Sequence, residues 1–246
     1  CFNKCALLEY FLLFNVRNVT IDGNECINCK SLKSIVIQST ATIELLSGCF
    51  CNATNLDSID IYGKSVIINH GCFTNCSSLE IFSITKSGDV KIGDNQFFKC
   101  IKLNKIVIES TIENETKTTP QIEFGQNCFS GANNLKEVLI TGGNIKISKQ
   151  CFKNCTLLNS IKFENVESLT IDSNQFRNFK SLTNLIIDSK SNVTFESYAF
   201  TGSKNLIFVS IKGTNVTLGN YCFQDCSSLS ILDFSKVHRL ELREYA

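Results

Sequence analysis

The sequence predicts a β-rich solenoid of about ten coils, each 23 or 24 residues long, with two parallel strand ladders. Three observations predict this fold. An aromatic position recurs along the whole chain, a leucine follows it six residues later, and two pairs of alternating apolar residues separate one aromatic from the next. Because one such unit cannot bury its own apolar side, the units are expected to stack and share a continuous core.

The recurring aromatic sets the phase of the repeat. Nine of its ten positions are phenylalanine and one is cysteine. These positions are Phe2, Cys26, Phe50, Phe73, Phe97, Phe129, Phe152, Phe176, Phe200 and Phe223. The leucines that follow are Leu8, Leu32, Leu56, Leu79, Leu103, Leu135, Leu158, Leu182, Leu206 and Leu229. Ten copies in phase argue against an unrelated globular enzyme fold.

Two alternating apolar pairs predict two strands in each coil. The first pair lies three and five residues after the leucine, as at Ile35 and Ile37. The second lies seven and five residues before the next aromatic, as at Val90 and Ile92. Alternation with period two is typical of a strand. Each coil is therefore expected to contain a turn or short helical piece around the aromatic, a strand, a loop and a second short strand.

Residues 1–246 are expected to form one array, with an insertion loop at about 111–120. The spacing from Phe97 to Phe129 is 32 residues, and the extra segment is mostly polar and contains the only proline, Pro120. It is expected to loop out between the two strands, either as tolerated decoration or as a functional loop. Because the chain lacks methionine and opens inside a repeat, we expect it to be a fragment of a longer array.

Composition and motifs restrict the function classes. Net charge is +1 without long runs of either sign, which argues against a surface for nucleic acid or anionic membrane. No apolar run approaches the roughly 20 residues of a membrane span. The two histidines, His70 and His238, lie far apart, and neither a phosphate-binding loop nor a hydrolase motif occurs. We therefore expect no enzyme activity, cofactor or metal site.

The repeat unit has a known counterpart. Its pattern, Cys/Ala-Phe-x-x-Cys-x-x-Leu-x-x-Ile-x-Ile followed by Val-x-Ile, resembles the BspA-like leucine-rich repeats of bacterial and protist surface proteins. The resemblance covers the whole chain and implies a leucine-rich-repeat solenoid, on a cell surface or secreted, that binds host cells, host matrix or other microbes. It implies no catalytic residues and leaves the partner unnamed. Departures are Cys26 in the aromatic slot and Ala53, Ala132, Phe179 and Ser203 in the second cysteine slot.

The fourteen cysteines leave two interpretations open. One is a set of local disulfides in an oxidising compartment, with candidate pairs Cys1–Cys5, Cys72–Cys76, Cys151–Cys155 and Cys222–Cys226. The other is buried free thiols, which alanine, serine and glutamine in the same slots favour. Residues four apart on a regular helix also rarely orient for a bridge. A zinc site from Cys26, Cys29, Cys49 and Cys51 is conceivable, but its spacings do not match and no histidine is close.

Seven Asn-x-Ser/Thr sequons are possible N-glycosylation sites. Three precede the second strand, three lie two residues after the aromatic position, and one lies in the insertion. They are Asn18, Asn192 and Asn215, then Asn52, Asn75 and Asn154, and finally Asn114. Glycans at these sites would leave the outward face of the first strand bare. The alternative is that asparagine simply suits turns.

The outward positions of the first strand form the predicted binding face. Many are apolar, whereas those of the second strand are polar almost throughout. The predicted ligand-binding residues are Phe14, Val36, Tyr62, Ile81, Val107, Leu139, Ile186 and Phe208. Exposed apolar clusters mark partner surfaces, although strands also favour such residues and a dimer could cover them. The predicted function is a non-enzymatic recognition module for a protein or glycan. The alternative is a structural array or intracellular protein-interaction scaffold.

Overall fold

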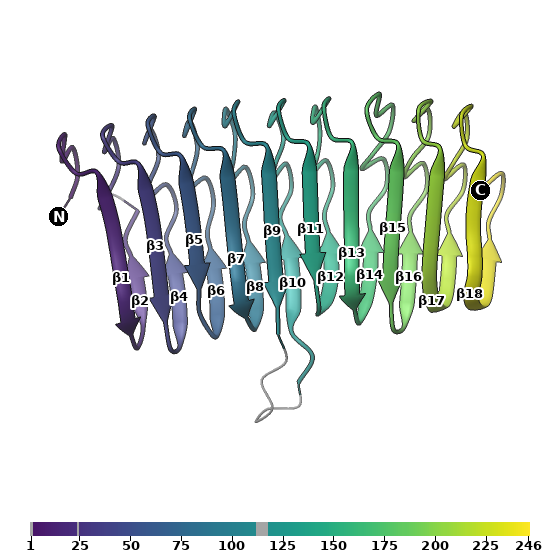
Figure 1. Cartoon of the computed structure of the whole chain (residues 1–246), viewed down its shortest axis with the longest axis horizontal. Helices are drawn as coiled ribbons and strands as arrows, with labels where there is room; N and C mark the ends of the chain where they lie inside the picture. Colours follow the sequence, from purple (N-terminus) through teal and green to yellow (C-terminus); the bar gives the residue numbers. More distant parts are fainter. Residues whose placement is uncertain (1, 24, 112–117) are drawn as a thin grey trace.

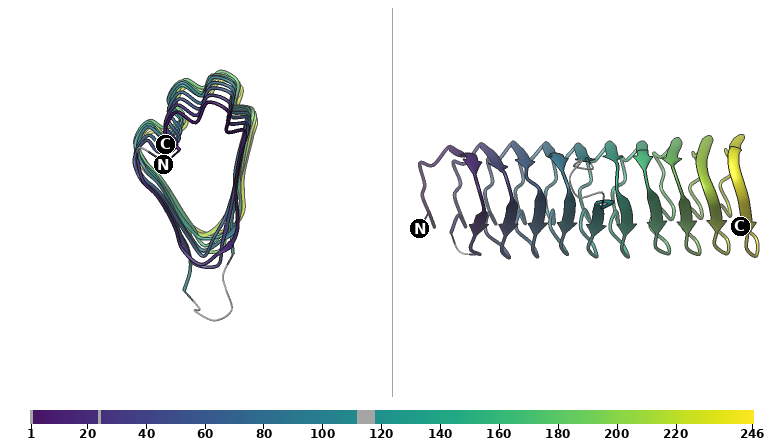
Figure 2. Two further views of the ribbon diagram at one scale, coloured as in Figure 1. Left: turned by 90° about the vertical axis from the view of Figure 1, so that its left-hand side faces the viewer. Right: turned by 90° about the horizontal axis from the view of Figure 1, so that it is seen from below.

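The computed structural model describes residues 2–23, 25–111 and 118–246 and shows a single solenoid (Figure 1). Each coil carries one strand of the first ladder down the front and one strand of the second ladder up the back. Seen along its axis, the coil is closed, with a scalloped turn region at one end and a narrow bend at the other (Figure 2). Every strand pairing is parallel, so both predicted ladders are confirmed.

Each ladder holds ten strand segments, because the last two strands run through both. The first ladder consists of β1 (Tyr10–Val16), β3 (Ser34–Ser39), β5 (Ser58–Tyr62), β7 (Ile81–Ser87), β9 (Lys105–Ser110), β11 (Glu137–Thr141), β13 (Ser160–Val166), β15 (Asn184–Ser189) and the first parts of β17 (Phe208–Leu218) and β18 (Ile231–Leu242). The second consists of β2 (Val19–Ile21), β4 (Thr42–Leu45), β6 (Ser65–Ile68), β8 (Asp89–Ile92), β10 (Gln121–Phe124), β12 (Asn144–Ile147), β14 (Ser168–Ile171), β16 (Asn192–Phe195) and the remainder of β17 and β18.

The segment around the aromatic contains no helix in any described coil, so of the two expected forms, a turn or a short helical piece, the turn is confirmed. Its amides alternate between two kinds of partner. In one coil, the Phe50 and Asn52 amides donate to Cys72 and Thr74 of the next coil at 3.0 and 2.9 Å, while the Ala53 amide closes a turn onto Phe50. Bonding to the next coil prevents the within-segment ladder of hydrogen bonds that a helix requires.

A left-handed residue also interrupts this segment in every coil. The position two residues after the aromatic has positive φ throughout, for example 64° at Asn52 and 65° at Asn154. Its occupants are Lys4, Asn28, Asn52, Asn75, Lys99, Gly131, Asn154, Asn178, Gly202 and Asp225. Glycine and asparagine tolerate this conformation best, which accounts for the five asparagines and two glycines found there.

The phenylalanine column forms the spine of the core. From Phe50 to Phe223 each ring stacks on the next, with centroid separations from 5.0 to 5.8 Å. Cys26 leaves one gap in this column. Phe11 of β1 fills it, because its ring packs edge-on against Phe2 at 6.1 Å and Phe50 at 5.5 Å. The missing aromatic is thus replaced from a strand position rather than from the turn.

The insertion leaves both ladders in register. Of residues 111–120, positions 112–117 and therefore Asn114 lie outside the described residues. The described flanks join β9 to β10 at the narrow end of the coil (Figure 2). Ile122 of β10 still pairs with Val90 of the previous coil and Ile145 of the next. The coil that carries the insertion therefore stacks like its neighbours.

Candidate binding surface

In-register pairing aligns the outward side chains of the first ladder in rows. The central row contains four of the predicted residues, Val36, Val107, Leu139 and Ile186, among other side chains. In order along the solenoid it is Leu12, Val36, Asp60, Ser83, Val107, Leu139, Lys162, Ile186, Ser210 and Asp233. Ile81 and Phe208 lie in the row nearer the turn, and Tyr62 lies in the row nearer the narrow end.

Exposure on this face is greatest at the N-terminal end. We call Tyr10, Leu12, Phe14, Val36 and Tyr62 the N-terminal apolar cluster. Tyr10, Leu12 and Phe14 are 55, 49 and 53% exposed, and Tyr62 is 38% exposed. Val36 is half-buried between its neighbours. The aromatic rings and Leu12 thus leave a contiguous apolar surface open to a partner.

Farther along, the face is divided by polar pairs. The Ser83 hydroxyl donates to the Asp60 carboxylate at 2.7 Å, just beyond the N-terminal apolar cluster. After this pair, Ile81 is 44% exposed, and Val107 and Leu139 are half-buried direct neighbours in the central row. Lys162 then separates Leu139 from Ile186. The predicted residues therefore gather in groups and do not form one continuous stripe.

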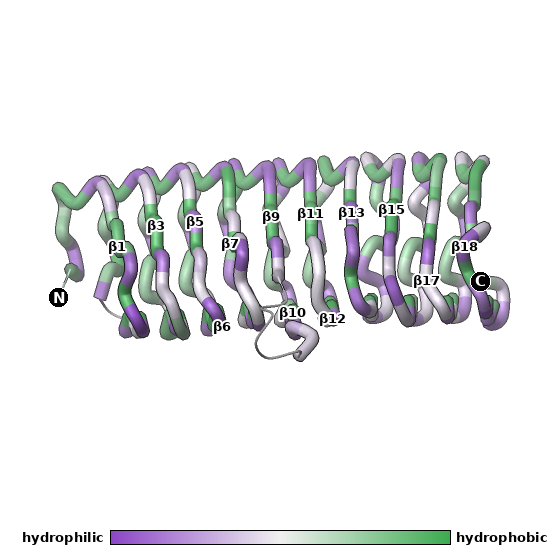
Figure 3. The backbone as a smooth tube through the Cα atoms, turned by 60° about the horizontal axis from the view of Figure 1, so that its bottom comes forward, coloured by the Kyte–Doolittle hydropathy of each residue, from purple (hydrophilic) through white to green (hydrophobic). Residues whose placement is uncertain are grey.

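Charged residues on this face pair across coils. Lys105 bonds Glu137 and Lys212 bonds Asp188, each at 3.5 Å between nitrogen and oxygen. Both are solvent-exposed pairs, which contribute at most about 1 kcal/mol each. Their main consequence is that these two lysines already have carboxylate partners. The second ladder alternates exposed or half-buried polar side chains with buried apolar ones, as in β8 and β12. Hydrophilic and hydrophobic segments alternate along the tube (Figure 3).

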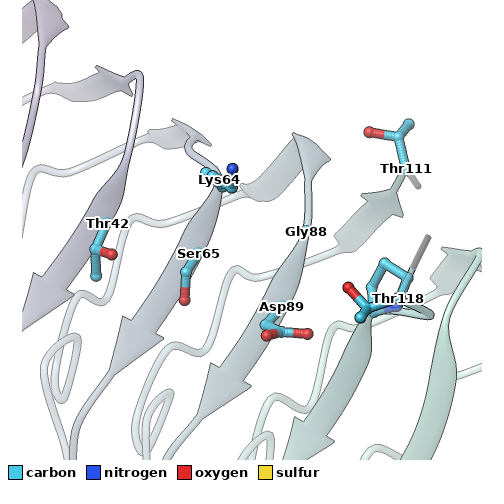
Figure 4. Close-up of a pocket in the computed structure, with 8 residues that line it drawn as sticks. Thr42, Lys64, Ser65, Gly88, Asp89, Thr111 and Thr118 are labelled. Atoms are coloured by element: carbon cyan, nitrogen blue, oxygen red, sulfur yellow. The ribbon is translucent and has the colours of Figure 1, made fainter. Parts of the chain in front are cut away.

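A polar groove lies at the foot of the insertion (Figure 4). Neighbouring turns of three coils supply Thr42, Lys64, Ser65 and Asp89, and the insertion flanks supply Thr111, Thr118 and Pro120. The Asp89 carboxylate accepts the Gln121 amide at 2.8 Å, so it caps the start of β10. The groove thus brings the described flanks of the insertion beside polar side chains of neighbouring coils. Sequence reasoning missed it, because stacking alone brings these turns together.

A tyrosine column was also missed. Tyr198, Tyr221 and Tyr245 stack with ring centroids 5.1 Å apart, and the guanidinium of Arg177 lies 5.9 Å from the Tyr198 ring. All three tyrosines have positive φ, a conformation that is uncommon for bulky residues. Their sequence signal is a shared place two residues before the recurring aromatic. The described neighbours in that column are mostly glycine, asparagine or glutamine.

The sequons differ in their surroundings. Asn18, Asn154, Asn192 and Asn215 are exposed, and Asn215 Nδ2 donates to Asn192 Oδ1 at 2.8 Å across adjacent coils. The half-buried Asn52 and Asn75 belong to a ladder of side-chain amides. In it, Asn52 Nδ2 donates to Asn28 Oδ1 and Asn75 Nδ2 donates to Asn52 Oδ1, both at 2.9 Å. Backbone conformation and this ladder give Asn52 and Asn75 a structural role, while their glycosylation stays a prediction.

Replacing Asn52 tests that structural role. Asn52→Gly should cost only the lost amide ladder, because glycine adopts φ near 64° without strain. Asn52→Ala should cost about 1–2 kcal/mol from the left-handed conformation, in addition to the lost amide ladder. Denaturant unfolding of the two variants side by side measures the difference. Equal stability of both variants would show that the backbone does not select the residue here.

All described cysteines are free thiols, so Cys72–Cys76, Cys151–Cys155 and Cys222–Cys226 are not bonded in the structure. Cys1–Cys5 includes Cys1, which lies outside the described residues. In the Cys72–Cys76 pair the two thiols face different atoms. The Sγ of Cys72 lies 3.1 Å from the Asn69 carbonyl oxygen, whereas that of Cys76 lies 3.5 Å from the Phe50 carbonyl oxygen.

The cysteine surroundings favour protonated thiols. Burial is the main cause that raises the pKa of Cys26 to about 12 and that of Cys226 to about 11. Within the described part of the chain, no group of three or more histidine, cysteine or acidic side chains is arranged to hold a metal ion.

The chain resembles several solved leucine-rich-repeat structures. A T. pallidum leucine-rich repeat protein is 19% identical, with TM-score 0.38, 86% of this chain covered and 72% of that one. A leucine-rich cell surface protein from Faecalibacterium prausnitzii is 13% identical, with TM-score 0.39 and coverage of 92 and 83%. A leucine-rich repeat protein from Bacteroides ovatus is 17% identical, with TM-score 0.37 and the same coverage. At these TM-scores the assignment depends on sequence.

No curated protein matches the sequence. Among the described residues, no helix is long and apolar enough to cross a membrane. The family model for the BspA type leucine rich repeat region matches six copies over residues 1–119 and 120–245. This match covers nearly the whole chain and agrees with the stacked coils, the phenylalanine spine and the two parallel ladders described above. The chain therefore belongs to the BspA-type leucine-rich repeat family.

Proposed function

We propose that this chain is a non-enzymatic recognition module, at a cell surface or secreted, that binds a protein or glycan of a host or another microbe. The observation that supports this most is the N-terminal apolar cluster on the outward face of the first ladder. Three of its side chains, Tyr10, Leu12 and Phe14, are about half exposed. Aromatic side chains with one apolar and one polar end are enriched where proteins bind partners. The cell-surface location follows from what the family resemblance implies.

The sheet holds this cluster in place before a partner arrives. Leu12 and Val36 are register partners, and the alternate residues of the same strands lie in the core. Because β1 is paired with β3, the backbone that carries the cluster is ordered, and little conformational entropy remains to be lost on binding. Coils spaced by about 4.8 Å also make the face long enough for a partner to contact several of them. Rigid, exposed apolar side chains in this arrangement favour recognition of a macromolecule.

An adhesion assay tests the proposal. The whole chain is applied to immobilised extracellular-matrix proteins, a glycan array and cultured host cells, and equilibrium binding is measured. Leu12→Lys and Leu139→Lys should each weaken binding at least about tenfold, because a buried, unpaired charge costs more than 1.4 kcal/mol. Both side chains point outward, so the midpoint of thermal unfolding should stay near that of the parent chain.

Thr170→Lys is the matched control. It adds the same charge at an exposed outward position of β14, on the opposite ladder. Binding by this variant should equal that of the parent chain. Undiminished binding by both leucine variants would refute the first-ladder face as the site, and so would equal weakening by Thr170→Lys. Failure of the parent chain to bind any of the three target classes would refute the adhesion function.

A further inference from the structure

Cysteines of adjacent coils lie against one another in the core. Two positions form columns along the solenoid, one immediately before the recurring aromatic and one three residues after it. In the first column the thiols of Cys49 and Cys72 contact each other, as do those of Cys128 and Cys151. In the second column the thiol of Cys76 contacts that of Cys100. All six side chains are completely buried.

Backbone pairing brings each pair to a separation that suits a disulfide. The amide of Phe50 donates to the carbonyl of Cys72 at 3.0 Å, and that of Phe129 donates to Cys151 at 2.8 Å. Backbones joined in this way lie about 4.8 Å apart, within the Cα separation of roughly 4.4–6.8 Å that a disulfide bridges. Neighbouring coils thus meet this geometric requirement for a disulfide.

The thiols of the second column also share one orientation. The Sγ atoms of Cys100, Cys155 and Cys226 each lie 3.1–3.2 Å from the carbonyl oxygen of the phenylalanine one coil earlier. Cys76 makes the same contact to Phe50 at 3.5 Å. Because identical side chains repeat with the coil, the Cβ atoms of Cys76 and Cys100 point in the same direction. Their sulfur atoms are therefore neighbours along the solenoid axis.

The sequence gives each of these thiols a single cysteine neighbour in its column. Gln96 separates Cys72 from Cys128 in the first column, and Gln175 follows Cys151. Both glutamines are buried and accept the amide of the preceding cysteine at 3.0 Å. In the second column Ala53 precedes Cys76 and Ala132 follows Cys100. Each run is two cysteines long, which is the number that one bridge consumes.

We propose that Cys49–Cys72, Cys76–Cys100 and Cys128–Cys151 are oxidised to disulfides that join adjacent coils when the chain folds in an oxidising compartment. The oxidant is a small disulfide such as glutathione disulfide. One thiolate attacks it, forming a mixed disulfide and releasing one glutathione thiol. The second cysteine then attacks the protein-bound sulfur and releases the second glutathione thiol. Two protein thiols and one small disulfide thus become one protein disulfide and two small thiols.

Because the six cysteines are buried in the folded chain, their oxidation must occur during folding. Desolvation raises the pKa of Cys49, Cys76 and Cys128, so these three thiols form little thiolate once the coils have closed. The absence of exposed surface on these side chains also excludes glutathione from the folded core. A bridge formed as one coil docks on the next is afterwards shielded from reductant. Each bridge would tie a coil to its neighbour and oppose separation of the stack.

Peptide mapping tests the pairing. The whole chain is refolded in a glutathione redox buffer, unfolded, alkylated without reductant and digested with trypsin. Cleavage after lysine places Cys128 on residues 118–136, Cys151 on 150–153 and Cys155 on 154–162. The expected product joins 118–136 to 150–153. A product that joins 150–153 to 154–162 would establish the pairing within one coil and overturn the proposal.

Two serine variants give an independent count of alkylated thiols. Cys76→Ser removes one partner of a pair and frees Cys100, so one more thiol than in the parent chain should be alkylated. The control Cys155→Ser removes a cysteine whose column neighbours are Ala132 and Phe179, so one fewer should be alkylated. Serine fits this slot, because the buried Ser203 hydroxyl donates to the Phe176 carbonyl at 2.7 Å.

The number of alkylated cysteines in the parent chain is a further test of the proposal. At most eight of the fourteen cysteines should be alkylated, since six are paired. Fourteen alkylated cysteines would overturn the proposal. One fewer alkylated thiol in both variants would show that Cys76 and Cys100 are not joined by a disulfide. These measurements do not involve a binding partner, so their failure is distinguishable from failure of the adhesion assay.

Discussion

Phe129→Ala should lower the free energy of unfolding by about 3–5 kcal/mol, the usual cost of removing a buried phenylalanine ring. Phe129 has no exposed surface and stacks between Phe97 at 5.1 Å and Phe152 at 5.2 Å. Phe124 of β10 also packs against it, with ring centroids 5.7 Å apart. Its loss would open a cavity at the coil that follows the insertion and break the stacked spine near its middle.

Hydrogen exchange measures this effect coil by coil, because each coil of a solenoid is stabilised mainly by its neighbours. Exchange should accelerate most in β9, β11 and β13, and much less in β1 and β18. Phe98→Ala is the control, since that side chain is 49% exposed and lies outside the column. It should change stability by less than about 1 kcal/mol. Similar losses of stability in both variants would contradict the stabilising role of the stacked phenylalanine spine.

Gly142→Ala should be the second most disruptive change, at about 3 kcal/mol. Gly142 lies in the turn between β11 and β12 with φ of 78°, which costs an alanine roughly 1–2 kcal/mol. A Cβ at this position would also overlap the carbonyl oxygen of Ser110 in the previous coil. Ser110 is the last residue of β9, immediately before the insertion. Relief of the overlap must shift backbone, at a cost of about 1–3 kcal/mol.

Gly131→Ala separates these two causes. Gly131 has a similar φ of 82°, but a Cβ there would have no neighbour within 4 Å. Denaturant unfolding should therefore show a loss of only about 1–2 kcal/mol, from the left-handed conformation alone. The difference between the two variants measures the close approach of the Gly142 turn to the base of the insertion. Equal losses of stability would mean that the backbone of the neighbouring coil shifts without a loss of free energy.

Much of the fold was predictable because register follows from periodicity. A repeat of constant length places the same position of every coil in one column, so Phe73, Phe97 and Phe129 had to meet once the coils stacked. The two alternating pairs likewise predicted which strand residues enter the core. The response to Cys26 was not predictable in this way. Phe11 fills the gap from an inward strand position, and ring packing in three dimensions selects that solution.

The candidate site was predictable only in part. Alternation correctly places Val107 and Leu139 on the outward face, and the register makes them direct neighbours. It does not reveal that Tyr10, Leu12 and Phe14 are about half exposed, whereas Val107 and Leu139 are less exposed. That distribution depends on how much each side chain is covered by the coils on both sides, as at the half-buried Val36.

Periodicity along the chain thus establishes the coil, its two strands and the columns, since these depend on spacing alone. Contacts between coils settle what the residues in each column do. The left-handed turn at positions such as Asn52 directs its amides to the next coil, which excludes the short helical piece that the sequence left open beside a turn. The same turn points Cys72 and Cys76 at different atoms and brings each close to a cysteine of another coil. Side-chain direction in a turn depends on backbone conformation and on neighbouring coils. Neither can be predicted from the spacing of residues in the sequence.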